Sequence, residues 1–183
     1  WIKKELQDQK AQAFLVCPFI EESESMSSVK AAVKEFETLK THVYPDLSMA
    51  LLHGRMKQQD KTTTLEQFRT KQTTILVSTP VVEVGIDIPN ATIMVIEAAD
   101  RFGLAQLHQL RGRVGRGDKQ SYCLLFTEST DPATINRLKI LETIHNGPDL
   151  AEEDMHIRGQ GDLFGSRQHG IPQIAFAALG NEQ

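Results

Sequence analysis

Two arginines near the end of the segment 103–117 have the residue type and spacing for phosphate chemistry. The segment reads Gly-Leu-Ala-Gln-Leu-His-Gln-Leu-Arg-Gly-Arg-Val-Gly-Arg-Gly, and Arg113 and Arg116 lie three residues apart within it. That spacing places two side chains on the same side of a helical turn. A guanidinium is a planar fork of hydrogen-bond donors that matches phosphate oxygens. The pair therefore predicts an anion-binding site with phosphate as its natural ligand.

Glycines at positions 112, 115 and 117 surround the two arginines. A glycine costs a helix about 1 kcal/mol relative to alanine, so this density is a heavy penalty for a segment that only had to be helical. We interpret the glycines as a requirement for close approach of the backbone to the anion. The alternative is a solvated basic helix end favoured by the helix dipole, which explains one or two arginines and leaves the glycines unexplained.

The elements that position these arginines follow from the hydrophobic pattern. Leu104, Leu107, Leu110 and Val114 recur at intervals of three and four, so the sequence predicts a helix with one apolar face that carries both arginines in its final turn. Unbroken apolar runs are typical of strands that are covered on both faces. Such runs predict strands at 13–17, 49–52, 74–77, 93–96 and 122–126.

Helical patterns alternate with these strands. Apolar residues from Val29 to Val43 mark one face of a helix, and 57–70 is predicted as a polar helix with Leu65 and Phe68 inward. Such alternation implies right-handed crossovers, so we expect an α/β fold with a mainly parallel sheet flanked by helices. Ligands of these sheets gather at the carboxyl ends of strands. Candidate loops that follow strands in this way are 18–25, 53–56 and 78–87.

Near residue 128 the alternation of predicted strands and helices ends, and helical patterns follow. Asp131 and Pro132 can start a helix, which apolar residues continue at helical spacing to Ile144. A break at 146–148 and a second helix over 150–158 complete a predicted helical hairpin. The segment 159–170 holds four glycines, so we expect a loop that can change shape; the alternative is a surface connector.

Composition bounds the class of protein. The chain has 183 residues, 40% of them hydrophobic and 24% charged, which is ordinary for a soluble domain with a core. Its formal charge of -4 means that any contact with nucleic acid is a local patch or is shared with another part of the protein. Cys17 and Cys123 lie in apolar runs and are expected to be buried small hydrophobes in a reducing cytoplasm. No apolar run approaches the roughly 20 residues of a membrane span, and the start at Trp1 suggests a piece of something longer.

Two stretches together resemble motifs V and VI of the superfamily-two helicases and translocases. They are 75–89, which reads Ile-Leu-Val-Ser-Thr-Pro-Val-Val-Glu-Val-Gly-Ile-Asp-Ile-Pro, and 103–117. With the segments 16–23, 53–56 and 158–168 added, the chain resembles the C-terminal part of the RecG family of ATP-dependent DNA helicases over roughly 11–172. The resemblance implies a second RecA-like helicase lobe over 1–128, a helical hairpin and translocation loop over 129–172, and a C-terminal tail over 173–183.

The same resemblance implies roles for individual residues. Arg113 and Arg116 would reach the γ-phosphate of ATP as arginine fingers, and Gln109 would make contacts in the same cleft. Gly85 and Asp87 would bind the nucleotide, with Asp87 on the ribose. Residues expected to hold a DNA strand by its phosphates are His53, Gly54, Arg55, Ser78 and Thr79. Residues expected to couple closure of the lobes to movement on DNA are Arg137, Arg158 and Gln168; for Arg137 alone, the alternative is an exposed helix charge.

Parts of an ATPase site are missing from the sequence. It contains no Gly-x-x-x-x-Gly-Lys-Ser/Thr and no Asp-Glu pair after an apolar strand, so nothing cradles the β-phosphate or holds Mg²⁺. We therefore expect ATP and Mg²⁺ to be bound mainly by a preceding lobe of the same parent protein, a monomeric motor that acts on branched or duplex DNA. No metal site is expected in this chain, which by itself should lack ATPase activity.

Two alternative functions stay open at this stage. The basic helix and the hairpin are also similar to those of the transcription-repair coupling factor, a translocase that pushes a protein off DNA. The Cys-Pro-Phe-Ile-Glu-Glu-Ser loop and Arg55 favour the helicase. The other alternative is a non-enzymatic module that binds a nucleotide or nucleic acid. Such a module would not need Arg113, Arg116 and Asp87 together.

Overall fold

A five-stranded sheet in the order β2-β3-β1-β4-β5 organises the chain. The structure is a computed structural model that describes residues 1–18, 26–80 and 88–164, with side chains left out for 26–28 and 158–164. All neighbouring strands run parallel, which confirms the predicted α/β fold with a parallel sheet. The strands are β1 (Gln12–Val16), β2 (Met49–Leu52), β3 (Ile75–Ser78), β4 (Ala91–Ile96) and β5 (Tyr122–Leu125), each within about two residues of its predicted place.

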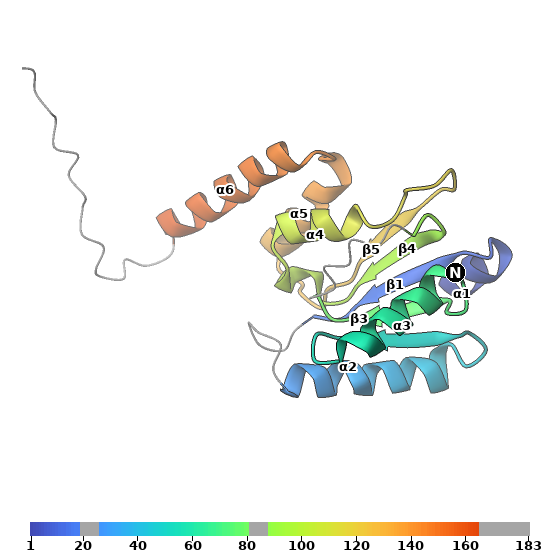
Figure 1. Cartoon of the computed structure of the whole chain (residues 1–183). Coiled ribbons are helices and arrows are strands. Elements are labelled where there is room, and N and C mark those ends of the chain that lie inside the picture. Colours follow the sequence, from blue (N-terminus) through green and yellow to red (C-terminus); the bar gives the residue numbers. More distant parts are fainter. Residues whose placement is uncertain (19–25, 81–87, 165–183) are drawn as a thin grey trace, which may run out of the picture.

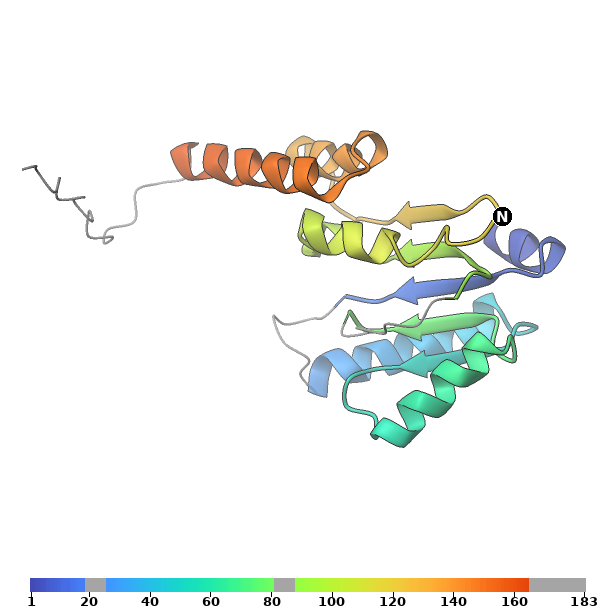
Figure 2. The ribbon, with the colours of Figure 1, turned by 45° about the horizontal axis from the view of Figure 1, so that its top comes forward.

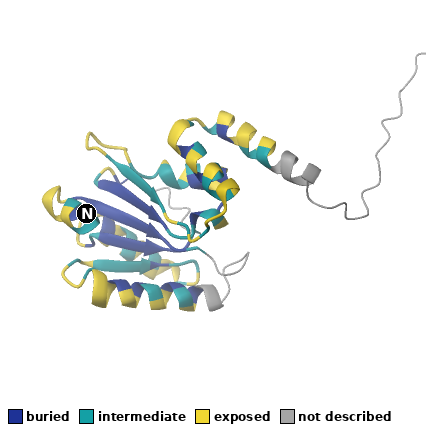
Figure 3. Ribbon diagram, turned by 180° about the vertical axis from the view of Figure 1, so that it is seen from behind, coloured by how far each residue is buried: buried dark blue, intermediate teal, exposed yellow. Residues whose placement is uncertain are grey.

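Both faces of the sheet are covered, which explains the unbroken apolar runs. Every residue of β1, β3 and β4 is buried, whereas the edge strands β2 and β5 are mostly half-buried. Side chains alternate along β1: Phe14 and Val16 join one hydrophobic core, and Ala13 and Leu15 join the other. The burial colours of Figure 3 show this central layer.

Helices on the two faces complete these cores. The helices α1 (Ile2–Asp8) and α2 (Met26–Thr38) cover one face, and α2 continues as a π-helical turn (Leu39–Val43). In that turn the Tyr44 amide donates to the Leu39 carbonyl at 2.7 Å, five residues back. Val43 at the end of this turn is 45% exposed, and Val33 within α2 is 38% exposed, so these two members of the predicted apolar face do not join the core.

The other face carries α3 (Gln58–Arg69) and α4 (Leu104–Arg111), which follows a short 3₁₀ turn, η2 (Ala99–Arg101). Phe68, Leu104 and Leu107 bury these helices in the core, as their spacing predicts. The helix α4 ends earlier than predicted, however. Gly112 is its C-cap, and the left-handed Gly115, with φ of 77°, cannot continue a helix. The prediction that Arg113 and Arg116 share a helical turn is therefore wrong, because both lie in the loop after α4.

The predicted helical hairpin is present as α5 (Pro132–Thr143) and α6 (Gly147–Phe164). The Asp131 carboxylate caps α5 by accepting from the Thr134 amide at 2.9 Å, and Pro132 takes the first helical position. Figures 1 and 2 show α6 extending beyond the body of the domain. Among the described residues, the structure contains no helix long and apolar enough to span a membrane.

One expectation for the hairpin is corrected. The helix α6 runs through Gly159 and Gly161 to Phe164, so the first residues of the predicted glycine-rich loop are helical. A glycine within a helix costs only about 1 kcal/mol, and propensity is a weak signal beside neighbouring helix formers such as Gln160 and Leu163. Residues 165–170 of that loop lie outside the described residues.

Candidate functional site

The predicted finger residues and the predicted DNA contacts lie at two opposite edges of the sheet. The carboxyl ends of parallel strands share one edge, where His53 follows β2 and Ser78 ends β3. The helix α4 instead returns the chain from the carboxyl end of β4 to the amino end of β5, so the loop 112–121 lies at the amino edge. Strands of four to six residues, at about 3.3 Å per residue, separate the two edges by about 13–20 Å.

Contacts of the loop 112–121 place it at the amino edge. Its Gly117 packs against the carbonyl of Pro89, which precedes β4. Its Lys119 donates to the carbonyl of Gln9, which precedes β1, at 2.8 Å. Figure 2 shows the connection between α4 and β5 on the same side of the sheet as the N-terminus. We name this loop, residues 112–121, the arginine loop.

The arginine loop brings the two predicted finger residues together outside a helix. Arg113 is half-buried, and its amide donates to the Leu110 carbonyl at 2.9 Å, which closes the last turn of α4. Arg116 is exposed, and its Nε donates to the Gly112 carbonyl at 3.0 Å. Gln109 is exposed on α4 just before the loop. These donor groups form a cationic surface at the amino edge that suits an anion.

Two of the three glycines of this loop have reasons within the fold. Gly115 adopts a φ of 77°, which L side chains rarely take. A Cβ on Gly117 would lie 2.9 Å from the Pro89 carbonyl oxygen, too close for any real side chain. A Cβ on Gly112 would meet only ordinary contacts at 3.5 Å. A turn at Gly115 and a backbone contact at Gly117 thus explain these two glycines, and the close approach of an anion stays a prediction.

The opposite, carboxyl edge presents the turn 53–56. The Met56 amide donates to the His53 carbonyl at 3.2 Å, and the Lys61 ammonium from α3 donates to the Gly54 carbonyl. Arg55 is exposed on this turn. His53 has its Nδ1 buried with no hydrogen-bond partner among the described residues. The hydrogen bond from Lys61 thus fixes the backbone of the turn, and Arg55 is exposed at the tip of the turn.

The other predicted DNA contacts differ in how far they are open to solvent. Ser78 is 2% exposed and Thr79 is 1% exposed, so their side chains do not reach the surface as the structure stands. The predicted nucleotide contacts Gly85 and Asp87 and the coupling residue Gln168 lie outside the described residues. Arg158 lies within α6, but its side chain is also outside them.

Arg137 fastens the hairpin to the lobe. Its guanidinium donates to the Asp100 carbonyl at 2.7 Å and to the Phe102 carbonyl at 2.9 Å, just before α4 begins. The alternative of an exposed helix charge is therefore wrong for Arg137. Backbone carbonyls are its partners, so its guanidinium acts as a clamp between α5 and the start of α4.

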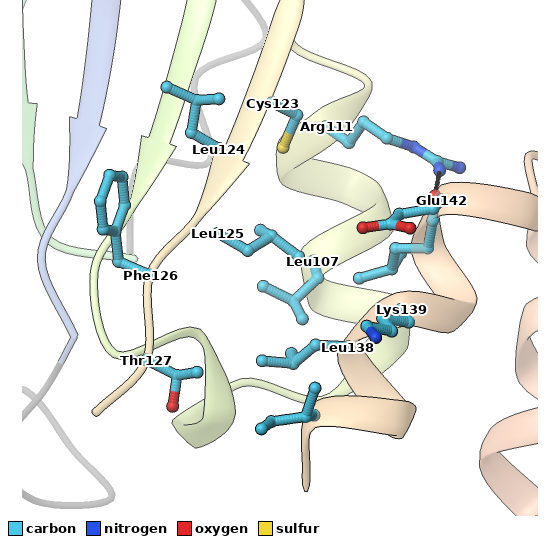
Figure 4. A pocket seen from close by; sticks show the side chains of 12 residues that line it. Leu107, Arg111, Cys123, Leu124, Leu125, Phe126, Thr127, Leu138, Lys139 and Glu142 are labelled. Atoms are coloured by element: carbon cyan, nitrogen blue, oxygen red, sulfur yellow. Dashed lines mark hydrogen bonds between the residues drawn. The ribbon is translucent and has the colours of Figure 1, made fainter. Parts of the chain in front are cut away.

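Arg111 makes the reciprocal contact from the end of α4, and the sequence analysis missed it. Its Nη1 donates to the carbonyls of Leu141 at 2.7 Å and Ile144 at 3.0 Å, which end α5. Its Nη2 donates to the His145 carbonyl at 3.1 Å and to the His108 Nδ1 at 2.8 Å. Because a guanidinium can only donate, the His108 Nδ1 is the acceptor of this hydrogen bond. Figure 4 shows Arg111 reaching across to α5. A basic residue in the last turn of a helix often donates to the terminal carbonyls of that helix. Arg111 instead donates to the terminal carbonyls of the neighbouring helix α5.

Two cavities of the domain do not include Arg113 or Arg116 in their lining. A cavity of about 500 Å³ opens between β5, α4 and α5, with Leu107, Cys123 and Leu138 in its lining (Figure 4). A second cavity, of about 480 Å³, lies at the carboxyl edge beside Glu97 and Phe126.

Titratable groups of the core are structural. Burial raises the pKa of Cys17 to about 12 and that of Cys123 to about 11, so both thiols stay protonated and unreactive at neutral pH. Cys17 is buried and Cys123 half-buried, as expected for small hydrophobes. Burial, followed by the neighbouring Glu35 and Glu128 carboxylates, raises the pKa of Glu97. Within 1–18, 26–80 and 88–164, no three His, Cys, Asp or Glu side chains form a group that could hold a metal ion.

Comparison with known proteins gives a family and close relatives. The model of the helicase conserved C-terminal domain matches residues 1–118. The chain is 50% identical over 175 residues to the ATP-dependent DNA helicase RecG of Synechocystis sp., covering 96% of this chain and 21% of that protein. It is 48% identical over 179 residues to RecG of Streptococcus pneumoniae, covering 98% of this chain and 26% of that protein. The chain thus spans about a quarter or less of the length of these relatives.

Solved structures agree with this likeness. The structure of RecG bound to a three-way DNA junction matches with a TM-score of 0.70 and 39% identity, over 88% of this chain and 21% of that one. Domain 2 of the DEAD-box helicase Mss116p, bound to an RNA duplex, matches with a TM-score of 0.61 and 24% identity over 78% of this chain and 53% of that one, which shows the fold alone. The predicted RecA-like lobe is therefore confirmed.

Proposed function

The chain belongs to the family of the helicase conserved C-terminal domain, and from this premise we propose that it is the second motor lobe of an ATP-dependent DNA helicase that remodels branched DNA. One observation carries the proposal: the loop that holds Arg113 and Arg116 precedes β5 at the amino edge of the sheet, and the turn that exposes Arg55 follows β2 at the carboxyl edge. A motor that moves along DNA needs separate sites for the nucleotide and for the DNA, joined by a rigid structural element. The RecG structure that this chain matches holds a three-way DNA junction, which supports branched DNA as the track.

The amino edge is the nucleotide side of the proposal. Phosphoryl transfer places charge on the equatorial oxygens of the γ-phosphate, and an arginine finger that stabilises it contributes a factor of about 10³ to 10⁵ in rate. Arg113 and Arg116 would supply these donors, with Gln109 beside them and Asp87 on the ribose next to Gly85. Arg116 would first leave the Gly112 carbonyl to which its Nε now donates.

ATP itself would be held mainly by a preceding lobe of the same protein. The guanidinium groups of the arginine loop suit phosphate, whereas the described residues bring together no carboxylate set for Mg²⁺. The cradle for the β-phosphate, the metal ligands and the catalytic base would therefore lie on that lobe. Closing the two lobes would bring the arginine fingers to the nucleotide. Both lobes would belong to one parent chain, which would work as a monomeric motor. The compartment that we propose for it is the cytoplasm.

The carboxyl edge is the DNA side of the proposal. Arg55 at the exposed tip of the turn 53–56, with His53 and Gly54, would contact strand phosphates. Ser78 and Thr79 are buried behind this turn and would reach DNA only after their neighbours rearrange. The net charge of -4 fits a local patch rather than a basic surface. Stalled forks and Holliday junctions, as met in recombination and repair, are the substrates we propose.

The hairpin would transmit closure of the lobes to the DNA. Arg137 and Arg111 fasten α5 to both ends of α4, so the arginine loop and the hairpin move as one body. The residues Arg158 and Gln168 would act after the chemical step.

The parent protein provides the test. We expect its ATP hydrolysis to be stimulated by DNA and to separate the arms of a three-way junction. Replacing Arg55 with Ala should weaken junction binding, while replacing Arg113 with Ala should abolish turnover and leave junction binding intact. ATP hydrolysis without strand separation would favour a translocase, and a parent without DNA-stimulated hydrolysis would refute the motor.

A further inference from the structure

We propose that Gly117 is a positioning residue whose backbone contact with Pro89 sets the place of Arg113 and Arg116. The inference rests on the proposed function of those arginines. It names a different residue, which touches neither nucleotide nor DNA and acts only through the arginine loop.

Position 117 requires glycine because a side chain would not fit there. A Cβ there would lie 2.9 Å from the Pro89 carbonyl oxygen and 3.7 Å from the Pro89 Cβ. The nearest obstacle is a backbone atom, which cannot rotate away as the end of a side chain can. The φ angle of Gly117 is not in the left-handed region, so alanine would meet the crowding alone. Gly115 differs, because its φ of 77° would strain any replacement.

Pro89 is a firm support because the turn that contains it is tied into the sheet. The Ala91 amide donates to the Ile88 carbonyl at 3.0 Å, and Ile88 is buried in the core. The Asn90 amide group donates to the Lys10 carbonyl at 3.0 Å and to the Gln12 side-chain oxygen at 3.3 Å.

Gln12 is itself fixed at the start of β1. It is buried, and its own amide donates to the carbonyls of Phe68 and Thr73. Any push between Gly117 and Pro89 would therefore displace the arginine loop and leave the turn in place.

Two contacts of the loop before Gly117 are local to it: the Val114 amide donates to the Arg111 carbonyl at 3.3 Å, and the Arg116 Nε donates to the Gly112 carbonyl at 3.0 Å. The last turn of α4 holds Arg113 through its amide, and Arg116 is the immediate neighbour of Gly117. Lys119 ties the chain to Gln9 only after Gly117. A displacement of about 1 Å at a catalytic group can cost about 10²-fold in rate. Binding of ATP would be spared because the preceding lobe provides most of it, so kcat falls while KM stays.

The test compares two glycine-to-alanine variants of the parent protein. Gly117→Ala should lower kcat for DNA-stimulated ATP hydrolysis by about 10²-fold, with KM for ATP within about threefold of the wild type. The matched control is Gly147→Ala at the start of α6, where a Cβ would meet only the His108 ring at an ordinary 3.5 Å, and its kcat should be unchanged. A Gly117→Ala enzyme with normal kcat overturns the proposal. A fall in kcat that only follows a lower Tm also overturns it, because that is a general loss of stability.

A second measurement separates this proposal from the proposed function. In the ¹⁵N-labelled chain, Gly117→Ala should shift the amide resonance of Arg113, four residues away, and leave those of Asn90 and Ala91 nearly unmoved. This pattern would support positioning even if the parent hydrolysed no ATP, in which case the motor proposal alone would fail. Shifts confined to residue 117 and its chain neighbours, or larger at the Pro89 turn than in the loop, would overturn the positioning role.

Discussion

At the scale of single residues, the arginines at the end of α4 and in the arginine loop differ in what they contact. Arg111, Arg113 and Arg116 lie within six residues, yet they do different things. Arg111 donates to backbone carbonyls of α5, whereas Arg113 and Arg116 lie on the loop at the amino edge. Position relative to the end of α4 separates the structural arginine from the two proposed fingers.

Arg116→Lys in the parent protein should reduce turnover and keep the fold. Lysine retains the charge but lacks the planar pair of donors that a transferring phosphoryl group needs. We expect kcat to fall by about 10²-fold, the usual loss when one such donor is removed, with little change in KM for ATP. Steady-state ATPase kinetics measure both values. A near-normal kcat would place Arg116 outside the nucleotide cleft.

Arg111→Ala should loosen the hairpin without touching the proposed fingers. It leaves the Leu141 and Ile144 carbonyls without their charged donor, at a cost of about 1–3 kcal/mol for buried groups of this kind. Urea unfolding and hydrogen exchange of the α5 and α6 amides measure the effect. Arg69→Ala is the control, because within the described part of the chain Arg69 pairs with Glu66 on the exposed face of α3. Equal behaviour of the two variants would show that the Arg111 contacts do not hold the hairpin.

At the scale of elements, α4 is the centre of the lobe. Its start is clamped by Arg137 and its end by Arg111, and both contacts lead to α5. The packing of Leu104 and Leu107 in the core fixes α4 to the sheet at the same time. Any force on the hairpin is therefore carried to the arginine loop and the sheet together.

The start of α5 should give the lobe a component of stability that depends on pH. The hydrogen bonds from the Thr134 side chain and amide lower the pKa of Asp131 in the folded chain. A depressed folded pKa means that the stabilisation is present above the unfolded pKa of about 3.9 and is lost as pH falls through the lower folded value. Asp131→Asn should therefore be less stable than wild type at pH 7, and the gap should shrink below about pH 3.9. Urea unfolding at pH 7 and pH 3 tests this; a gap that is constant with pH would mean that the charge of the cap contributes nothing.

At the scale of the whole molecule, the two loops at opposite edges define what the lobe can and cannot do alone. The sequence of the arginine loop contains no Gly-x-x-x-x-Gly-Lys-Ser/Thr, and the described residues form no group of three His, Cys, Asp or Glu side chains that could hold a metal ion. At the other edge, Arg55 is the exposed residue of the turn 53–56. In the motor that we propose, the arginine loop would face a second lobe and the turn would face DNA.

The isolated chain should consequently show no ATP hydrolysis, with or without DNA. The sequence lacks the Gly-x-x-x-x-Gly-Lys-Ser/Thr motif that cradles a β-phosphate and the Asp-Glu pair that holds Mg²⁺. A phosphate-release assay on the purified chain measures this, and the parent protein at equal concentration is the positive control. DNA-stimulated turnover from the chain alone that is abolished by Arg113→Ala would overturn the view of it as half a site.

The sequence by itself determined most of the elements and the family. Runs such as 49–52 and the Asp131-Pro132 helix start were predictable because burial on both faces and helix capping leave signals within a few residues. The resemblance of 75–89 and 103–117 to helicase motifs gave the family, which the comparisons confirm.

Only the tertiary structure decided where these groups lie. The direction of α4 puts Arg113 and Arg116 at the edge opposite the turn 53–56, and spacing along the chain carries no such information. Burial of Ser78 and Thr79 likewise depends on neighbours distant in sequence. Arg111 finds its partners 30 or more residues away, and Gly117 meets Pro89 across the start of β4. Such contacts form only when the whole domain packs, so no local pattern can encode them.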